Sequence, residues 1–381
     1  MKEPKIRFKG FSGEWKECTL SNIITVNSGK DYKHLEKGTI PVYGTGGYML
    51  SVNTSLSEHD AIGIGRKGTI DKPQYLKAPF WTVDTLFFLT TNNGDNLDFL
   101  FSLSQNIRWQ KYDESTGVPS LSKNNIDKIR TCIPNKFEQQ SVASFFTSLD
   151  AQISASTSRL ASLNQMKAAS LQAMFPQEGE TVPKVRFKGF EGEWKTRSLN
   201  YYAKKRTEKN VNRIYNVTLT NSAEFGIIDQ RQFFDHDISN SENIDGYFVV
   251  RDKDFVYNPR ISASAPVGPI NQNKLGYPGV MSPLYLVFEV KGINHDFLEI
   301  YFHTALWHKY MFDNGNSGAR FDRLTISDDD FMRMPIPDIS LAEQQSIASF
   351  FTSLDRQIAL HTQRLEKLKQ IKAACLDKMF V

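Results

Sequence analysis

The sequence contains few cysteines and no long hydrophobic run. Its three cysteines, Cys18, Cys132 and Cys375, are odd in number and far apart, so they predict neither a disulfide framework nor a CxxC metal site. We therefore expect a reducing, cytoplasmic location. No stretch of about eighteen or more apolar residues is present, and the N-terminus lacks the apolar core of a signal peptide. The sequence therefore predicts neither export nor a membrane partner.

An excess of charge of one sign is also missing. The chain has 46 Lys and Arg residues against 42 Asp and Glu residues, a formal net charge of +4. This balance permits nucleic-acid binding without requiring it, because many mildly basic globular proteins have the same composition. The length of 381 residues exceeds that of one ordinary core, so two or more domains are expected.

Several catalytic signatures are absent or incomplete. GIGRKG at 63–68 has the G-x-G-x-x-G spacing, but Pro73 prevents the helix that a dinucleotide site needs. No G-x-x-x-x-G-K-[ST] loop is present for nucleotide hydrolysis. YGTGGY at 43–48 and NPR at 258–260 match methyltransferase motifs only in part, and His303 and His308 lack zincin spacing. We therefore predict a non-catalytic chain with no metal site and no cofactor of its own.

Two long repeats are the most informative feature that is present. KIRFKGFSGEWK at 5–16 returns as KVRFKGFEGEWK at 184–195, and EQQSVASFFTSLD at 138–150 returns as EQQSIASFFTSLD at 343–355. The intervening segments, 17–137 and 196–342, show little mutual resemblance. Nearly identical repeats on both sides of dissimilar segments predict two variable domains held by the same conserved elements. A solenoid differs, because its short repeats resemble each other throughout. A recent gene duplication would also preserve identity, but it does not explain why only the ends were kept.

Each second repeat opens a segment with helical periodicity and without Gly or Pro. Apolar residues recur there at alternating three- and four-residue steps, which is typical of a coiled-coil seam. We expect the two helices to pair antiparallel and to form a subunit interface. The predicted seam residues are Leu149, Ile153, Leu160, Leu163, Leu354, Ile358, Leu365 and Leu368. The predicted segments are a domain at 1–137, a helix at 138–176, a domain at 177–342 and a helix at 343–381.

Each variable segment has the pattern of a mixed α/β domain. Short β-branched and aromatic runs alternate with Gly, Asn and Pro, and one helix is predicted in each domain, over 96–112 and 296–312. The order of elements is similar although the sequences differ. This favours one fold that carries two different surfaces.

Polar and basic loops next to glycines follow the predicted strands. Arg, Lys, Asn and Ser are donors that reach base edges and phosphates, and glycine lets the backbone approach a duplex closely. We predict DNA contacts from these residues, with Asn212 and Arg213 as alternatives in the second domain; solvated turns have a similar composition. In the first domain they are Arg66, Lys67, Thr69, Ser115, Thr116, Ser120, Ser122, Lys123 and Asn124. In the second they are Asn258, Arg260, Ser262, Asn316, Ser317, Arg320 and Arg323.

The repeat that opens each half has two possible roles. Phe8, Phe11 and Trp15, with their counterparts Phe187, Phe190 and Trp194, are suited to anchor each domain to the helical frame. The alternative is phosphate binding by the basic residues of the same repeat, Arg7, Lys9, Arg186 and Lys188.

Taken together, these segments resemble the specificity (S) subunit of type I restriction-modification systems. The resemblance covers essentially the whole chain. It is carried by RFKGFxGEW at the start of each half, IGRKGTI and FWTVDTLFF within 64–88, TGVPSLSKNNIDKIRTCIPNKFEQQ at 116–140, YNPR and SPLYLVF within 257–288, and MPIPDISLAEQQSIASFFTSLD at 334–355.

The resemblance implies an α+β architecture of two mixed α/β target recognition domains separated by two long conserved helices. These helices would form an antiparallel coiled coil with pseudo-twofold symmetry. Each domain would read one half of a split, asymmetric site in double-stranded DNA, and the helices would set the spacer. The implied partners are two modification (M) subunits, which use S-adenosylmethionine, and restriction (R) subunits, which use ATP and Mg²⁺. The alternative is a scaffold or dimerisation module that does not read DNA.

Overall fold

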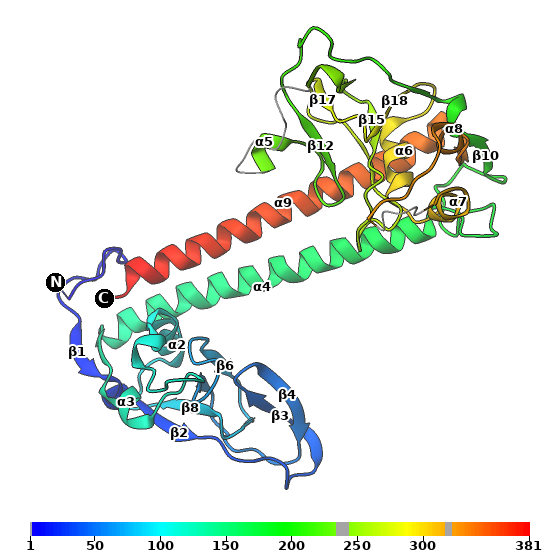
Figure 1. Cartoon of the computed structure of the whole chain (residues 1–381). Helices are drawn as coiled ribbons and strands as arrows, with labels where there is room; N and C mark the ends of the chain where they lie inside the picture. The colour runs from blue at the N-terminus through cyan, green and yellow to red at the C-terminus, as the bar shows by residue number, and fades with distance from the viewer. Residues whose placement is uncertain (1, 234–243, 317–321) are drawn as a thin grey trace. The chain divides into compact units, whose positions relative to one another are not determined.

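The structure is a computed structural model that describes residues 2–233, 244–316 and 322–381. The chain forms two compact units (Figure 1). Unit 1 comprises Met1–Leu160 with His361–Val381, and unit 2 comprises Ala161–Leu360. Two long helices, α4 (Lys136–Ala173) and α9 (Leu341–Met379), each contribute a segment to both units.

A four-stranded antiparallel sheet forms the centre of unit 1. Its order is β2-β8-β5-β6, and every residue of β5 is buried because helix α2 and a second sheet cover it. The second sheet has the order β4-β3-β7, and a two-stranded pair, β1-β9, joins the start of the domain to its end. The strands are β1 (Lys16–Thr19), β2 (Ile24–Ser28), β3 (Lys37–Gly44), β4 (Gly47–Val52), β5 (Ala61–Gly65), β6 (Gln74–Leu76), β7 (Trp81–Thr82), β8 (Leu86–Thr91) and β9 (Arg130–Ile133).

Unit 2 is built around a sheet of the same kind. The order β11-β18-β15-β16 is again antiparallel, and the pair β10-β19 corresponds to β1-β9. Two further pairs, β12-β13 and β14-β17, complete the described strands. The strands are β10 (Lys195–Ser198), β11 (Ala203–Lys205), β12 (Leu219–Ser222), β13 (Gly226–Asp229), β14 (Phe248–Val250), β15 (Phe255–Tyr257), β16 (Ile270–Gln272), β17 (Gly279–Met281), β18 (Leu286–Val290) and β19 (Pro335–Asp338). The prediction of one fold in both domains is thus confirmed.

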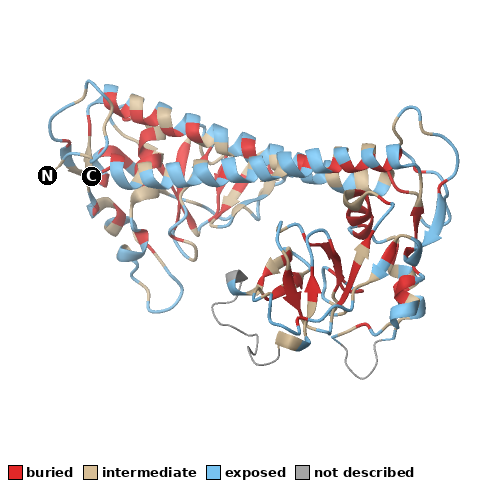
Figure 2. Cartoon of the chain, turned by 90° about the horizontal axis from the view of Figure 1, so that it is seen from above, coloured by how far each residue is buried: buried red, intermediate tan, exposed pale blue. Residues whose placement is uncertain are grey.

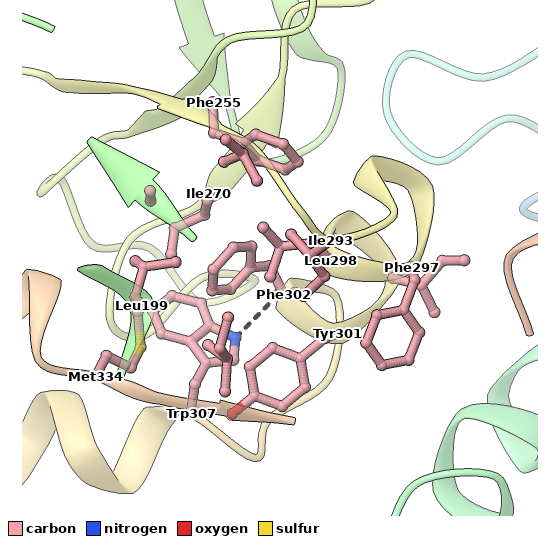
Figure 3. Packing of buried hydrophobic residues seen from close by; sticks show 14 of the residues in the cluster. Leu199, Phe255, Ile270, Ile293, Phe297, Leu298, Tyr301, Phe302, Trp307 and Met334 are labelled. Atoms are coloured by element: carbon pink, nitrogen blue, oxygen red, sulfur yellow. Dashed lines mark hydrogen bonds between the residues drawn. The ribbon is translucent and has the colours of Figure 1, made fainter. Parts of the chain in front are cut away.

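The structure corrects one prediction about the shorter helices. The segments 96–112 and 296–312, each predicted as a single helix, each form two separate helices. In unit 2 the first of the two helices ends at Phe302. The Trp307 indole donates a hydrogen bond to the Phe302 carbonyl at 3.0 Å, which stabilises the turn between the two helices (Figure 3). In unit 1 the Trp109 indole makes the same bond to the Ser104 carbonyl at 2.8 Å. The short helices are α1 (Leu20–Ile23), α2 (Leu97–Asn106), η1 (Trp109–Tyr112), α3 (Lys123–Lys128), η2 (Leu199–Tyr201), α5 (Gln230–Phe233), η3 (Ile244–Gly246), α6 (His295–Phe302), α7 (His308–Asn314) and α8 (Asp328–Met332).

The predicted seam positions lie on the inner face of both long helices. Leu149, Leu163, Leu354 and Leu365 are buried, and the other four predicted positions are partly buried. Figure 2 shows buried strands within the units and many exposed positions along the helices. Among the described residues, no helix is long and apolar enough to cross a membrane.

The two helix segments within each unit run antiparallel. In unit 1, Lys372 pairs with Asp150 at 2.6 Å, and in unit 2, Lys167 pairs with Asp355 at 2.6 Å. Asp150 and Asp355 are the last residues of the two EQQS repeats, so the same ion pair occurs once in each unit.

Each unit is closed by the C-terminal end of the helix that starts in the other unit. Phe380, just after α9, packs in unit 1 against Trp15 and Phe146 with ring centroids 6.1 and 5.8 Å apart. Phe175, just after α4, packs in unit 2 against Trp194 at 5.6 Å. Both phenylalanines are almost fully buried. The core of each unit therefore includes a residue that follows the long helix that starts in the other unit.

The first residue of the EQQ sequence explains the repeat that opens each half. Glu138 is only 1% exposed, and its carboxylate accepts bonds from Arg7 at 2.7 and 2.8 Å and from the Trp15 indole at 3.3 Å. In unit 2, Glu343 is 3% exposed and accepts from Arg186 at 2.7 and 2.8 Å and from Trp194 at 3.2 Å.

These contacts favour the anchor role over phosphate binding for the two arginines of the repeat, and they leave the exposed Lys9 and Lys188 untested. The bond to Glu138 raises the pKa of the Arg7 guanidinium, and the bond to Glu343 does the same for Arg186. Both guanidinium groups, which are only partly exposed, are therefore engaged in charge-assisted bonds within the protein. Phe8 and Phe187 pack on Phe145 and Phe350, as the anchor interpretation requires. The repeat is a joint that attaches each domain to its helix.

The two glutamines that follow extend this joint to the next helix of the domain. The Gln139 carbonyl oxygen accepts from the backbone N–H of Asn96 at 3.1 Å, and Gln140 accepts from the Asn96 side chain at 2.8 Å. Asn96 in turn caps α2 by accepting from the Phe99 N–H. Gln344, Gln345 and Asn294 repeat the arrangement at α6. Each residue of EQQ thus has a defined partner in both units.

We predict that Glu138→Ala lowers the free energy of unfolding of unit 1 by about 3 kcal/mol, because it leaves the Arg7 charge without its partner. Glu343→Ala should cost a similar amount in unit 2. Urea unfolding followed by tryptophan fluorescence measures both losses. Glu366→Ala, which removes only the exposed pair with Lys369, is the control and should cost under about 1 kcal/mol. Equal effects of Glu138→Ala and the control would contradict the proposed joint.

Candidate nucleic-acid interface

Two of the predicted loops in the first domain lie side by side. One connects β5 to β6 and carries Arg66 and Lys67; the other precedes α3 and includes residues 115–120. Gly68 donates its N–H to the Pro119 carbonyl at 2.8 Å, and Leu121 donates to the Arg66 carbonyl at 2.9 Å. Lys67 and Ser120 form an isolated antiparallel bridge. Backbone bonds therefore hold the two loops together.

The equivalent loops of the second domain are joined in the same way. Arg260 and Arg323 form an antiparallel bridge, and Leu324 donates to the Pro259 carbonyl at 2.9 Å. Asn316 and Thr325 pair further along this loop. Two of the predicted contact residues, Ser317 and Arg320, lie outside the described residues. Lys67 and Arg260 thus occupy corresponding positions in the two domains.

A carboxylate fixes the shape of the second loop in the first domain. The Asp113 side chain accepts from the Ser120 and Ser115 N–H groups at 2.9 Å each and from the Ser115 hydroxyl at 2.8 Å. These bonds, that to Ser120 foremost, hold the pKa of Asp113 below its usual range. The loop therefore keeps its shape at neutral pH, and loses this support only as the pH falls through the lowered pKa.

The remaining predicted residues of the first domain divide by exposure. Thr116, Lys123 and Asn124 are exposed and can reach a ligand, whereas Thr69, Ser115 and Ser120 are partly buried. Ser122 has an internal role, because its hydroxyl caps α3 by accepting from the Asn125 N–H at 3.2 Å. The sequence signal for Ser122 was that of a helix cap as much as that of a DNA contact.

The cations differ between the two domains. In the first domain, Arg66 lies over the Phe87 ring at 5.8 Å, and among the described residues neither Arg66 nor Lys67 has an ion-pair partner. In the second domain, Arg260 and Arg323 both lie near Asp322, at 3.7 and 3.9 Å. The alternative candidate Arg213 is paired with Asp245.

A buried amide network supports the second-domain loops. Asn221, 1% exposed, donates to the Val256 carbonyl at 2.7 Å and accepts from the Asn271 amide at 2.7 Å. Asn258 donates to the Asn221 carbonyl at 2.9 Å and accepts from the Arg260 N–H at 3.0 Å. Both functional groups of Asn258 are thus used internally. Asn258 helps in this way to position Arg260, and its predicted contact with DNA stays a prediction.

A cavity of about 400 Å³ opens beside this network. It is lined in part by Asn258, Arg260, Ser262 and Arg323, which the sequence had singled out, and by Asn221 and Tyr285, which it had not. Ser262 is exposed, and its hydroxyl accepts from the Ala265 N–H. Sequence reasoning missed Asn221 because an Asn within a β-branched run carries no motif; its role appears only when β12 lies beside β15 and β16.

A metal centre is not formed by the residues that the structure describes, since no group of three or more His, Cys, Asp or Glu side chains converges there. The arrangement that is present is a pair of basic, backbone-joined loops in each domain. Such loops can bind phosphates and base edges.

The protein-family model described as "Type I restriction modification DNA specificity domain" matches the chain twice, over residues 12–165 and 193–370. The chain belongs to this family. The two matches correspond to the two halves that the repeats define. No curated protein sequence matches the chain.

Among the solved structures, the first of the following three shows the same fold. The type I restriction-modification S subunit from M. genitalium is 12% identical, with a TM-score of 0.67, over 100% of this chain and 99% of that one. A structure titled for complex assembly and conformational transition of the type I R-M system is 15% identical, with a TM-score of 0.49, over 96% and 97%. The HsdS subunit from Thermoanaerobacter tengcongensis is 15% identical, with a TM-score of 0.45, over 100% and 99%.

The amide network generates a testable prediction. Asn221→Leu keeps the side-chain size but leaves the Asn271 amide and the Val256 carbonyl without their partner, so the free energy of unfolding of unit 2 should fall by at least about 2 kcal/mol. Asn314→Leu, at an exposed helix end where one amide reaches the Tyr310 carbonyl, is the matched control and should stay within about 0.5 kcal/mol. Urea denaturation compares the two. A loss no larger than that of the control would mean that the network does not support the loops.

Proposed function

We propose that this chain is the DNA sequence-recognition subunit of a type I restriction-modification complex. Each domain reads one half of a bipartite, asymmetric site in double-stranded DNA. The observation that carries the proposal is the pair of basic loops held together by backbone bonds at corresponding places in both domains. Membership of the specificity-domain family supports the same function. Since DNA is the substrate of such a complex, the proposal includes the cytoplasmic location expected from the sequence.

We further propose that the chemistry belongs to partner subunits. Two modification subunits would supply S-adenosylmethionine and the methyl transfer, and restriction subunits would supply ATP- and Mg²⁺-dependent cleavage. Modification enzymes of this kind take the target base out of the stack, so the recognition subunit needs only to bind and position the duplex. The complex as a whole is thus a DNA adenine methyltransferase and endonuclease, and this chain is its non-catalytic part.

The long helices have two parts in the proposal. They set the spacer between the two half-sites, and they dock the modification subunits. The eight seam residues are buried or partly buried within the protein, so their contribution to docking would come through the helix pair. Large apolar side chains that remain outside, such as Phe137, which is 83% exposed, and Leu341, favour docking along the same helices.

We predict that the double change Arg66→Ala with Lys67→Ala weakens binding to the cognate duplex and reduces the salt dependence of affinity. Each phosphate that is no longer neutralised by a cation lowers the slope of log K against log salt by about 1. Methylation should fail or relax at the first half-site only, whereas Arg260→Ala should affect the second. Fluorescence anisotropy at several salt concentrations and long-read methylome sequencing measure these effects, with the chain and its modification subunits expressed together.

Arg130→Ala is the matched control for this experiment. It removes an exposed cation from β9, at the strand pair that joins the ends of the first domain, and it should leave the salt slope unchanged. Unaltered DNA binding by both loop variants, with assembly intact, would instead support the scaffold alternative. A parent complex that methylates no split motif would overturn the proposed function altogether.

A further inference from the structure

The turn between β3 and β4 lies against the basic loops of the first domain. This turn is formed by Thr45 and Gly46 within the sequence YGTGGY, which none of the assignments above uses. The Thr45 hydroxyl lies 3.7 Å from the position that a Cβ on Gly68 would occupy. Gly68 in turn donates its N–H to the Pro119 carbonyl. Three segments from distant parts of the sequence therefore meet around Gly68.

The turn is held rigidly in this place. Gln74, the first residue of β6, donates its side-chain amide to the Gly44 carbonyl at 3.0 Å and to the Thr45 carbonyl at 3.1 Å. The rings of Tyr43 and Tyr48 pack edge to face with centroids 6.5 Å apart, and the Tyr48 hydroxyl bonds Ser51 at 3.1 Å. Tyr48 is nevertheless 63% exposed. A turn fixed this firmly presents one defined surface to a ligand.

The glycines of this turn have different reasons for being glycine. Gly47 has a φ of +107°, which strains other residues, and a Cβ on Gly44 would lie 2.8 Å from the Met49 sulfur. Gly46 has neither reason, because its φ lies outside the left-handed region and a Cβ there would meet no atom within 4 Å. The fold of the described chain does not require glycine at position 46.

Gly117 shows the same property on the other side of Gly68. It lies in the loop at 115–120, its φ is also outside the left-handed region, and a Cβ would again meet no atom within 4 Å. Both glycines are exposed. Arg66 and Lys67, exposed and without ion-pair partners among the described residues, lie on the loop whose Gly68 meets both segments, at Thr45 and at Pro119. A bare backbone in both segments that adjoin this loop is suited to close approach by an anionic polymer.

We propose that the turn at 44–48 is a third DNA-contacting segment of the first domain, and that Gly46 and Gly117 are the points where the sugar-phosphate backbone of the duplex comes closest. This inference rests on the proposed function. Side chains at these two positions would hold the phosphates away from Arg66 and Lys67. Gly46 and Gly117 are in this sense specificity-determining, because they set the depth at which the loops enter the first half-site.

The test uses the full chain in complex with its modification subunits. The variants are Gly46→Ala, the bulkier Gly46→Leu, and Gly117→Ala. Because each added side chain points into open space, the melting temperature should be unchanged or slightly raised. Affinity for a duplex carrying the motif that the parent complex methylates should fall at least about tenfold for Ala and further for Leu.

Gly246→Ala is the matched control. Gly246 lies in the second domain, also has open space around its missing Cβ, and has no left-handed φ. This variant should leave methylation at the first half-site unchanged. Parent-like affinity of Gly46→Leu and Gly117→Ala would overturn the inference while leaving the proposed function intact. The proposed function itself fails if the parent complex methylates no split motif.

Discussion

The buried carboxylate at the start of each long helix is the interaction on which the rest of the structure depends. A carboxylate that is almost fully buried is tolerated only when charged and hydrogen-bonding partners surround it. Glu138 and Glu343 meet this condition with one arginine and one tryptophan each, drawn from the segment that opens the same half. The first turn of each helix therefore cannot move relative to its domain without leaving a charge unpaired. The glutamines that follow accept hydrogen bonds from the residues that cap α2 and α6, so these helices are also fixed relative to the long helices.

This constraint explains why the ends of the two halves are nearly identical while their middles differ. The residues of the joint contact one another, so a change in one leaves another without its partner. The recognition loops are fixed differently, since the bonds that join them run between backbone atoms, as between Gly68 and Pro119 or Leu324 and Pro259. Backbone bonds do not depend on side-chain identity. Exposed loop side chains with no structural role, such as Thr116, can therefore change without disturbing the loops, whereas Asp113 and Asn258 cannot.

The extent to which the sequence predicts this structure follows from the range of the interactions involved. The seam of α4 and α9 was predictable, because its three- and four-residue spacing is a local pattern. The break after Phe302 was not, because it depends on a tertiary bond from the Trp307 indole within an otherwise helical pattern. The partners of Glu138 lie more than a hundred residues away in sequence, so the repeats indicated that a joint exists without identifying its chemistry. The sequence predicts which loops carry polar and basic side chains. The internal hydrogen bonds of Asn258 and Ser122 can be recognised only from the fold.

The cations of the proposed DNA-binding loops have different partners in the two domains. Arg66 and Lys67 are available, whereas Arg260 and Arg323 share Asp322. An exposed ion pair contributes at most about 1 kcal/mol, so a phosphate can replace Asp322 at little cost. Until then the carboxylate keeps both guanidinium groups near the bridge that joins their loops, and it offsets their attraction for non-specific DNA. In the proposed complex with DNA, the second domain would exchange one anion for another, whereas the first would neutralise cations that have no ion-pair partner among the described residues. Two domains with one fold can in this way respond differently to the same polyanion, because the difference lies in the loops and leaves the joint unchanged.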